Sequence, residues 1–156
     1  MPNVRTNTND EELITNEELL NIKVCSFRRI PAPVRTDSDA DPQMYIAICN
    51  VKDIPKQLLN WMDTNPRKQN TNSGVSKKIK KSLLEDPDFH LLNRGLLISA
   101  STVTYNNYDN VMTLTFSDKE VHGDVDGGHT LRIILENVDD IPDDQERFVK
   151  LEILTG

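Results

Sequence analysis

The chain has 156 residues, 37% hydrophobic and 28% charged, which is typical of one folded domain with a core of its own. No run approaches the roughly 18 consecutive apolar residues of a membrane span, and no apolar segment of the secretory type follows Met1. Composition therefore argues against a membrane protein and predicts a cytoplasmic location.

The net charge of −7 argues against a general nucleic-acid coat, but the charge is unevenly distributed. Residues 67–81 contain six basic residues and no acidic one. This segment fits either a solvated helix face or a surface directed at phosphates or an acidic partner. Cys25 and Cys49 both lie in apolar, strand-like runs and outside any CxxC pair, so we expect two buried, reduced thiols rather than a disulfide.

The first part of the chain predicts a tail, a short helix, two strands and a longer helix. Residues 1–14 are polar and expected to be disordered, and residues 15–156 are expected to form a single α/β domain. Residues 16–20 fit the start of a short helix, and residues 22–30 and 44–51 fit strands. A helix with Asp53 as its N-cap should follow and end near residues 65–66. Its apolar face comprises Ile54, Leu58, Trp61 and Met62.

The second part predicts a helix, a hairpin, a further helix and a last strand. After a loop at 69–74, a helix should place Val75, Ile79 and Leu83 on one side and end at Pro87. Residues 96–105 and 111–116 predict a β-hairpin, and residues 148–154 predict a strand. Because the chain stops so soon after this strand, we expect it to be the N-terminal part of a longer protein. These elements together predict a mixed sheet with packed helices.

The segment 123–130 carries three glycines within six residues and runs from a strand into an amphipathic helix. Glycine permits positive φ and a close approach to a ligand, and free N–H groups at a helix start attract anions, phosphate above all. His129 and Arg132 are three residues apart and should share one helix face. The turn therefore predicts an anion site.

Other interpretations of this turn remain open. It can be purely structural, since its spacing is neither GxGxxG nor a P-loop, and an EF-hand alignment fails at its first and last positions. A metal site formed by His122, Asp124, Asp126 and His129 has no defined ligand spacing, and we predict no metal site. Asp126 is expected to N-cap the helix; the alternative is that Asp124 or Asp126 positions a water or Mg²⁺ for hydrolysis.

Several motifs resemble, in their order, the abortive-infection phage-resistance (AIPR) family. They are Asn65-Pro66-Arg67, the helix that begins at Val75, the Pro87 to Phe89 segment, Asn93-Arg94-Gly95, and the turn from Asp126 to Thr130. The resemblance covers roughly residues 55–155 and implies a phage-defence role.

The same turn resembles the DGQHR motif of ParB-like proteins, which implies a ParB-like fold and a strand-turn-helix that binds nucleotide phosphates. Thr130 stands where that motif has arginine, and Arg67 or Arg132 is expected to substitute for it.

These observations predict a module that binds a nucleotide, with Mg²⁺ as a possible companion, or nucleic-acid phosphates. The alternative is an interaction module that docks an acidic partner, such as a missing C-terminal effector region, through its basic helix. The residues expected to bind phosphate are Asn65, Arg67, Asn93, Arg94, Asp126, Gly127, Gly128, His129, Thr130 and Arg132, and those expected to contact nucleic acid are Lys77, Lys78, Lys80 and Lys81.

Overall fold

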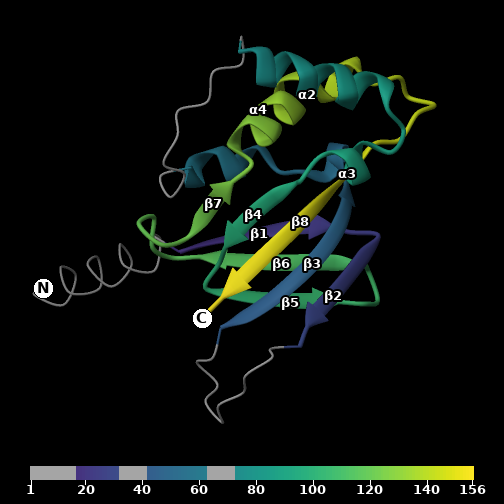
Figure 1. The fold of residues 1–156 in the computed structure, drawn as a ribbon. Coiled ribbons are helices and arrows are strands. Elements are labelled where there is room, and N and C mark those ends of the chain that lie inside the picture. Colours follow the sequence, from purple (N-terminus) through teal and green to yellow (C-terminus); the bar gives the residue numbers. More distant parts are fainter. Residues whose placement is uncertain (1–16, 32–41, 63–72) are drawn as a thin grey trace, which may run out of the picture.

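Two β-sheets and a small group of helices make up the protein in the computed structural model, which describes residues 17–31, 42–62 and 73–156 (Figure 1). The strands are β1 (Glu18–Lys23), β2 (Ser26–Ile30), β3 (Gln43–Asn50), β4 (Leu96–Ser99), β5 (Thr102–Asn106), β6 (Val111–Phe116), β7 (Gly123–Asp126) and β8 (Phe148–Thr155). The α-helices are α2 (Gly74–Glu85), α3 (Phe89–Leu92) and α4 (Gly128–Asn137), and the 3₁₀ helices are η1 (Val51–Asp53), η2 (Lys56–Trp61) and η3 (Val138–Asp140).

The larger sheet has the strand order β2-β3-β8-β4-β7, and the smaller sheet has the order β1-β6-β5. Within the larger sheet β4 and β8 are parallel, while the other neighbours are antiparallel. The central strand β8 alternates buried and half-buried residues, as a strand between two packed layers requires. The sheet is therefore mixed, as the sequence predicts, and the α+β class is confirmed.

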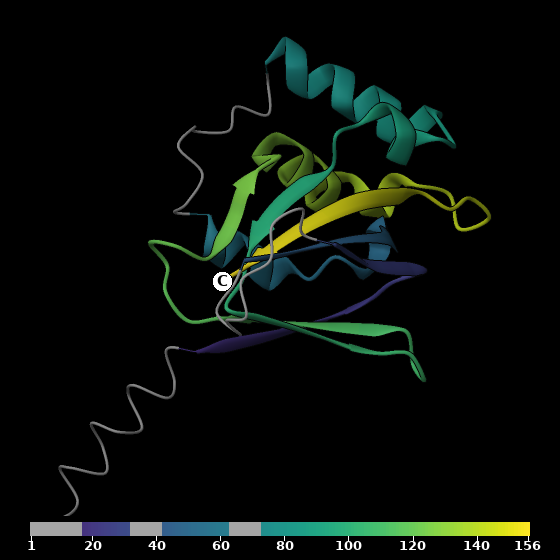
Figure 2. The ribbon, with the colours of Figure 1, turned by 60° about the horizontal axis from the view of Figure 1, so that its bottom comes forward.

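The larger sheet lies between a layer of helices and the smaller sheet (Figure 2). Helices α2 and α4 pack against each other, and the inner side chains Leu83, Leu131 and Ile134 are fully buried. On the other side, the rings of Phe27 in β2 and Tyr105 in β5 stack with centroids 4.5 Å apart and join the two sheets.

Two predicted strands are each divided between the two sheets. The predicted strand 22–30 is interrupted at Val24 and Cys25, so that β1 joins the smaller sheet and β2 the larger. The predicted strand 96–105 is divided in the same way, between β4 and β5. Only the β5–β6 half of the predicted hairpin is therefore confirmed.

The short helix predicted at residues 16–20 is wrong, because β1 begins at Glu18 and pairs with β6. Its burial alternates, with Leu20 and Ile22 inside, which is the period of a strand. The helix predicted after residue 53 forms as the shorter 3₁₀ helix η2, with Pro55 in the N-cap position. Asp53 ends η1 instead of capping η2.

Other expectations are confirmed. Leu58 and Trp61 are buried, residues 43–50 form β3, and residues 148–155 form β8.

Residues 1–14, the predicted tail, lie outside the described residues. Within the described residues, no helix combines the length and the apolar character that crossing a membrane requires.

The two cysteines differ in their environment. Cys49 is fully buried in β3, and burial, reinforced by the charge of Asp53, raises the pKa of its thiol. Cys25 is exposed, which corrects the prediction that both are buried; its Sγ donates to the Ile48 carbonyl. Both thiols are free.

Candidate functional site

Two glycine turns meet at one end of the larger sheet. Asn93, Arg94 and Gly95 lead into β4, and Gly127 follows β7. Because β4 and β7 are antiparallel neighbours, the start of one strand lies beside the end of the other. Gly95 and Gly127 have φ of 81° and 88°, and a Cβ on Gly127 would lie 2.4 Å from the Gly95 carbonyl oxygen. The contact between the turns therefore requires glycine at position 127.

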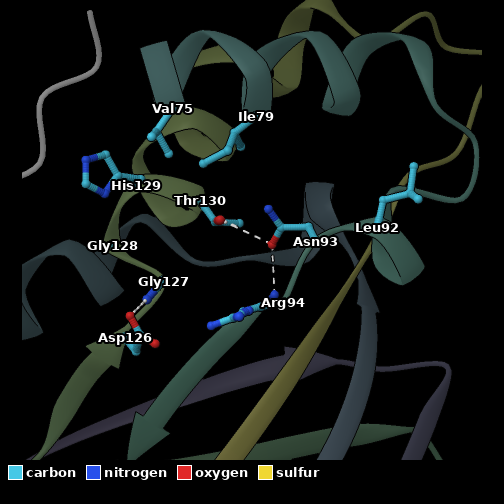
Figure 3. A pocket seen from close by; sticks show the side chains of 11 residues that line it. Val75, Ile79, Leu92, Asn93, Arg94, Asp126, Gly127, Gly128, His129 and Thr130 are labelled. Atoms are coloured by element: carbon cyan, nitrogen blue, oxygen red, sulfur yellow. Dashed lines mark hydrogen bonds between the residues drawn. The ribbon is translucent and has the colours of Figure 1, made fainter. Parts of the chain in front are cut away.

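A side-chain amide joins the two turns (Figure 3). The Oδ1 atom of Asn93 accepts hydrogen bonds from the Gly95 backbone N–H at 2.8 Å and from the Thr130 hydroxyl at 3.2 Å. With Oδ1 so engaged, the Nδ2 group remains as a donor with no recorded bond to another described residue. Asn93 thus fixes the start of β4 against the first turn of α4.

A cavity of about 340 Å³ opens between these turns and helices α2 and α3. Its lining consists of Val75, Ile79, Leu92, Asn93, Arg94, Gly95, Asp126, Gly127, Gly128, His129 and Thr130. Seven of these are predicted phosphate-binding residues, drawn from two segments that are separated by about thirty positions in the chain. The Arg94 side chain extends toward Asp126 below the turn (Figure 3).

Helix α4 begins at this cavity without a side-chain cap. Gly127 is the N-cap residue, and the first helical bond is donated by the Leu131 N–H to the Gly127 carbonyl, at 2.9 Å. The N–H groups of Gly128, His129 and Thr130 precede that bond and have no acceptor within the helix. Such groups favour an anion at this end.

The expected capping role of Asp126 is wrong. Its Oδ1 atom accepts from the adjacent Gly127 N–H at 2.9 Å, so the carboxylate holds the turn rather than the helix. Asp124, the other candidate for positioning a water, is fully buried in β7 and does not line the cavity. Of these two carboxylates, Asp126 is therefore the one that lines the cavity.

The structure does not bring every predicted residue to the cavity. Arg132 is half-buried on α4 and lies outside the lining, although His129 of the same helix is part of it. Asn65 and Arg67 lie outside the described residues. The predicted nucleic-acid contacts are exposed on α2 and are not part of the cavity lining; they are Lys77, Lys78, Lys80 and Lys81.

Four lining residues are missing from the sequence-based set: Val75, Ile79, Leu92 and Gly95. Val75 and Ile79 fit a core-facing stripe in the sequence, but Val75 is 61% exposed and the neighbouring Ser76 is fully buried. The buried side of α2 is therefore rotated from the apolar pattern. Leu92 gives no periodic signal in its short helix, whereas Gly95 belongs to the Asn93-Arg94-Gly95 motif.

The histidines and acids near the turn form no evident metal centre. No group of three or more His, Cys, Asp or Glu side chains suited to a metal ion occurs in the part of the chain that the structure describes. The Nδ1 atom of His122 accepts from the backbone N–H groups of Ser117 and Asp118, each at 3.1 Å. His122 thus holds the loop before β7.

A second cavity of about 300 Å³ adjoins the first and shares Arg94, Gly95 and Asp126 with it. Lys150 and Glu152 of β8 lie on its far side and form an ion pair at 3.3 Å. Arg94 and Asp126 thus line both the glycine-lined cavity and a second recess that also contains Lys150 and Glu152.

No curated protein and no solved structure matches the chain. A family model described as AIPR protein matches residues 62–156, which is more than half of the chain and includes both glycine turns, α2 and α4. Membership of this family implies abortive-infection phage resistance. The chain belongs to the AIPR protein family.

Proposed function

We propose that this domain binds the phosphate group of a nucleotide or of a nucleic-acid backbone, as the ligand-binding module of a cytoplasmic phage-defence protein. The observation that carries the proposal is the meeting of the two glycine turns in one cavity. Both turns lie within the segment that identifies the family.

The chemistry of the lining supports an anion. Arg94 provides a permanent cation, Asn93 provides an amide donor, and the first turn of α4 provides backbone donors. Asp126 is the acidic residue among the described residues of the lining. Arg94 stands in for the arginine that the DGQHR motif would place at Thr130. In this proposal β7, Gly127 and α4 form a ParB-like strand-turn-helix.

Mg²⁺ is part of the proposal if the ligand is a nucleoside triphosphate. Magnesium is commonly held by one or two carboxylates together with substrate phosphates and water. One oxygen of Asp126 is engaged with Gly127, and the carboxylate lines the cavity beside Arg94. Asp126 would hold the ion through its other oxygen.

Isothermal titration of ATP into the protein, with and without Mg²⁺, tests the proposal. We expect Arg94→Ala to weaken binding by about 10- to 100-fold, because a charge-assisted contact is lost. Arg132→Ala is the matched control, since it removes an arginine two residues after Thr130 that does not line the cavity. Binding that Arg94→Ala leaves unchanged, or that both substitutions weaken equally, would count against this pocket.

A second candidate function is docking of an acidic protein partner through α2. The observation that favours it is that the four lysines are exposed and that none of them lines the cavity. In that case reversing these charges would abolish phage resistance in plating assays, while Arg94→Ala would leave it intact.

A further inference from the structure

We infer that the ligand is a free mononucleotide whose base rests on an apolar wall of the cavity, opposite the groups that hold its phosphate. The inference rests on the proposed phosphate site and adds the part of the ligand that the apolar wall recognises. It also distinguishes a mononucleotide from a polynucleotide, which the phosphate contacts alone do not.

The cavity has two chemically different sides (Figure 3). Arg94, Asp126 and the glycine turn form the polar side, and Val75 and Ile79 of α2 form the apolar side across from it (Figure 3). Leu92 of α3 adds an apolar side chain at the other end of the cavity, beyond Asn93 (Figure 3). A purely inorganic anion would gain nothing from the apolar side. A ligand that is anionic at one end and flat and apolar at the other matches both sides.

The apolar side is open to solvent at its rim. Val75 is 61% exposed and Leu92 62% exposed, although both line the cavity. Covering such side chains with the face of a base removes apolar surface from water and stabilises the complex. Leu91 is also exposed, at 75%, but lies outside the lining. A substitution at Leu91 is therefore the control for the loss of an exposed leucine that does not line the cavity.

The positions of Lys77, Lys80 and Lys81 favour a mononucleotide over a strand. At about 100° per residue, Lys77, Lys80 and Lys81 lie about 120–160° around α2 from Val75, and Lys78 lies about 60° away. Among the described residues, the lining contains one arginine and no lysine. A polynucleotide needs a basic track that follows several phosphates, whereas this cavity is close to the lower limit of about 300 Å³ for small-molecule sites.

Isothermal titration with three probes tests the inference: ATP, tripolyphosphate, and a single-stranded oligodeoxynucleotide of about 12 bases. We expect Leu92→Ser to weaken ATP binding about tenfold and to leave tripolyphosphate binding within about twofold. Leu91→Ser should leave both unchanged. Val75→Ser is the second variant and should repeat the Leu92→Ser result, and thermal unfolding confirms that each variant is folded.

The outcomes separate this inference from the proposed function. Equal affinity for ATP and tripolyphosphate, or equal effects of Leu92→Ser on both, would remove the base contact and leave the phosphate site standing. Tightest binding of the oligodeoxynucleotide, with loss of affinity in Leu92→Ser, would assign the wall to a strand and overturn the inference. If none of the three probes binds the folded wild-type protein, the proposed function fails and this inference with it.

Discussion

The two sides of helix α2 differ in their surroundings. On the inner side Ser76 and Leu83 are fully buried against the domain, and Val75 and Ile79 face the cavity. On the outer side four lysines are exposed, and no ion pair is recorded between them and another described residue. A specific binding site needs side chains in fixed positions, whereas a charged surface needs only the charges. The inner side therefore suits a defined ligand, and the outer side suits long-range attraction.

The C-terminal end of α2 is anchored by Arg147, which is almost fully buried before β8. Its Nε donates to the Leu83 carbonyl at 2.9 Å, and one terminal nitrogen donates to the Leu84 carbonyl at 3.1 Å. The guanidinium thus satisfies carbonyls in the last turn of α2 and places its charge where the helix dipole favours a cation.

The largest expected effect comes from removing this anchor. Arg147→Met should lower the free energy of unfolding by about 3 kcal/mol, because buried carbonyls lose charge-assisted hydrogen bonds. Urea denaturation followed by circular dichroism measures it. Arg28→Met, at an exposed position of β2, is the control and should change stability little. Similar stabilities for the two variants would show that Arg147 does not hold α2.

An intermediate effect is expected on the outer side. Replacing Lys77, Lys78, Lys80 and Lys81 by Gln should leave ATP affinity within about twofold. If these lysines contact a strand, the same variant should reduce the salt dependence of single-stranded DNA binding by up to about 3 logarithmic units per tenfold change in salt. Fluorescence anisotropy at several salt concentrations measures this slope.

A charge-matched variant is the control for the lysine substitutions. Neutralising four exposed cations elsewhere, Lys23, Lys52, Lys56 and Arg29, gives the same net charge without altering α2. If both variants change the slope equally, net charge rather than the outer side of α2 is responsible. A large loss of ATP affinity in the α2 variant alone would show that the outer side of α2 takes part in ligand binding, which contradicts the distinction between the two sides.

The smallest effect is expected at the start of α2. The Ser73 hydroxyl oxygen accepts from the Ser76 backbone N–H at 3.1 Å and caps the helix. Ser73→Ala should cost about 1 kcal/mol of stability and increase hydrogen exchange in the turn that carries Val75. Ser26→Ala in β2 is the control. Unchanged exchange in α2 would mean that packing alone fixes this end.

Much of the candidate site is already present in the sequence as two separate motifs. Asn93-Arg94-Gly95 and the turn at 126–130 both stand out by their glycines and polar residues, and both line the cavity. Arg132 is a helix neighbour of His129 but is excluded from the lining, because three positions along a helix do not guarantee the same surroundings. The apolar residues of the lining were not predicted as site residues. Val75 fits the apolar pattern of an ordinary core-facing helix, and Leu92 belongs to no periodic pattern.

The elements of the fold were predictable where the pattern is local. The hairpin β5–β6, the strand β8 and the helix after the glycine turn follow from alternation, turn residues and helical spacing. The points where the chain passes from one sheet to the other were not predictable. Residues 22–30 and residues 96–105 each form one continuous strand-like sequence, although the structure divides each of them between the two sheets. Strand propensity says nothing about which partner a strand chooses.

The class of the domain, its family and the two polar glycine motifs could be predicted from the sequence, because these depend on residue types and on short spacings. The tertiary structure decided that the motifs share one cavity, since only the antiparallel pairing of β4 with β7 brings Gly95 against Gly127. It also decided which side of α2 faces that cavity. Ser76 and Leu83 are buried against the domain, so Val75 faces the cavity and the lysines remain outside.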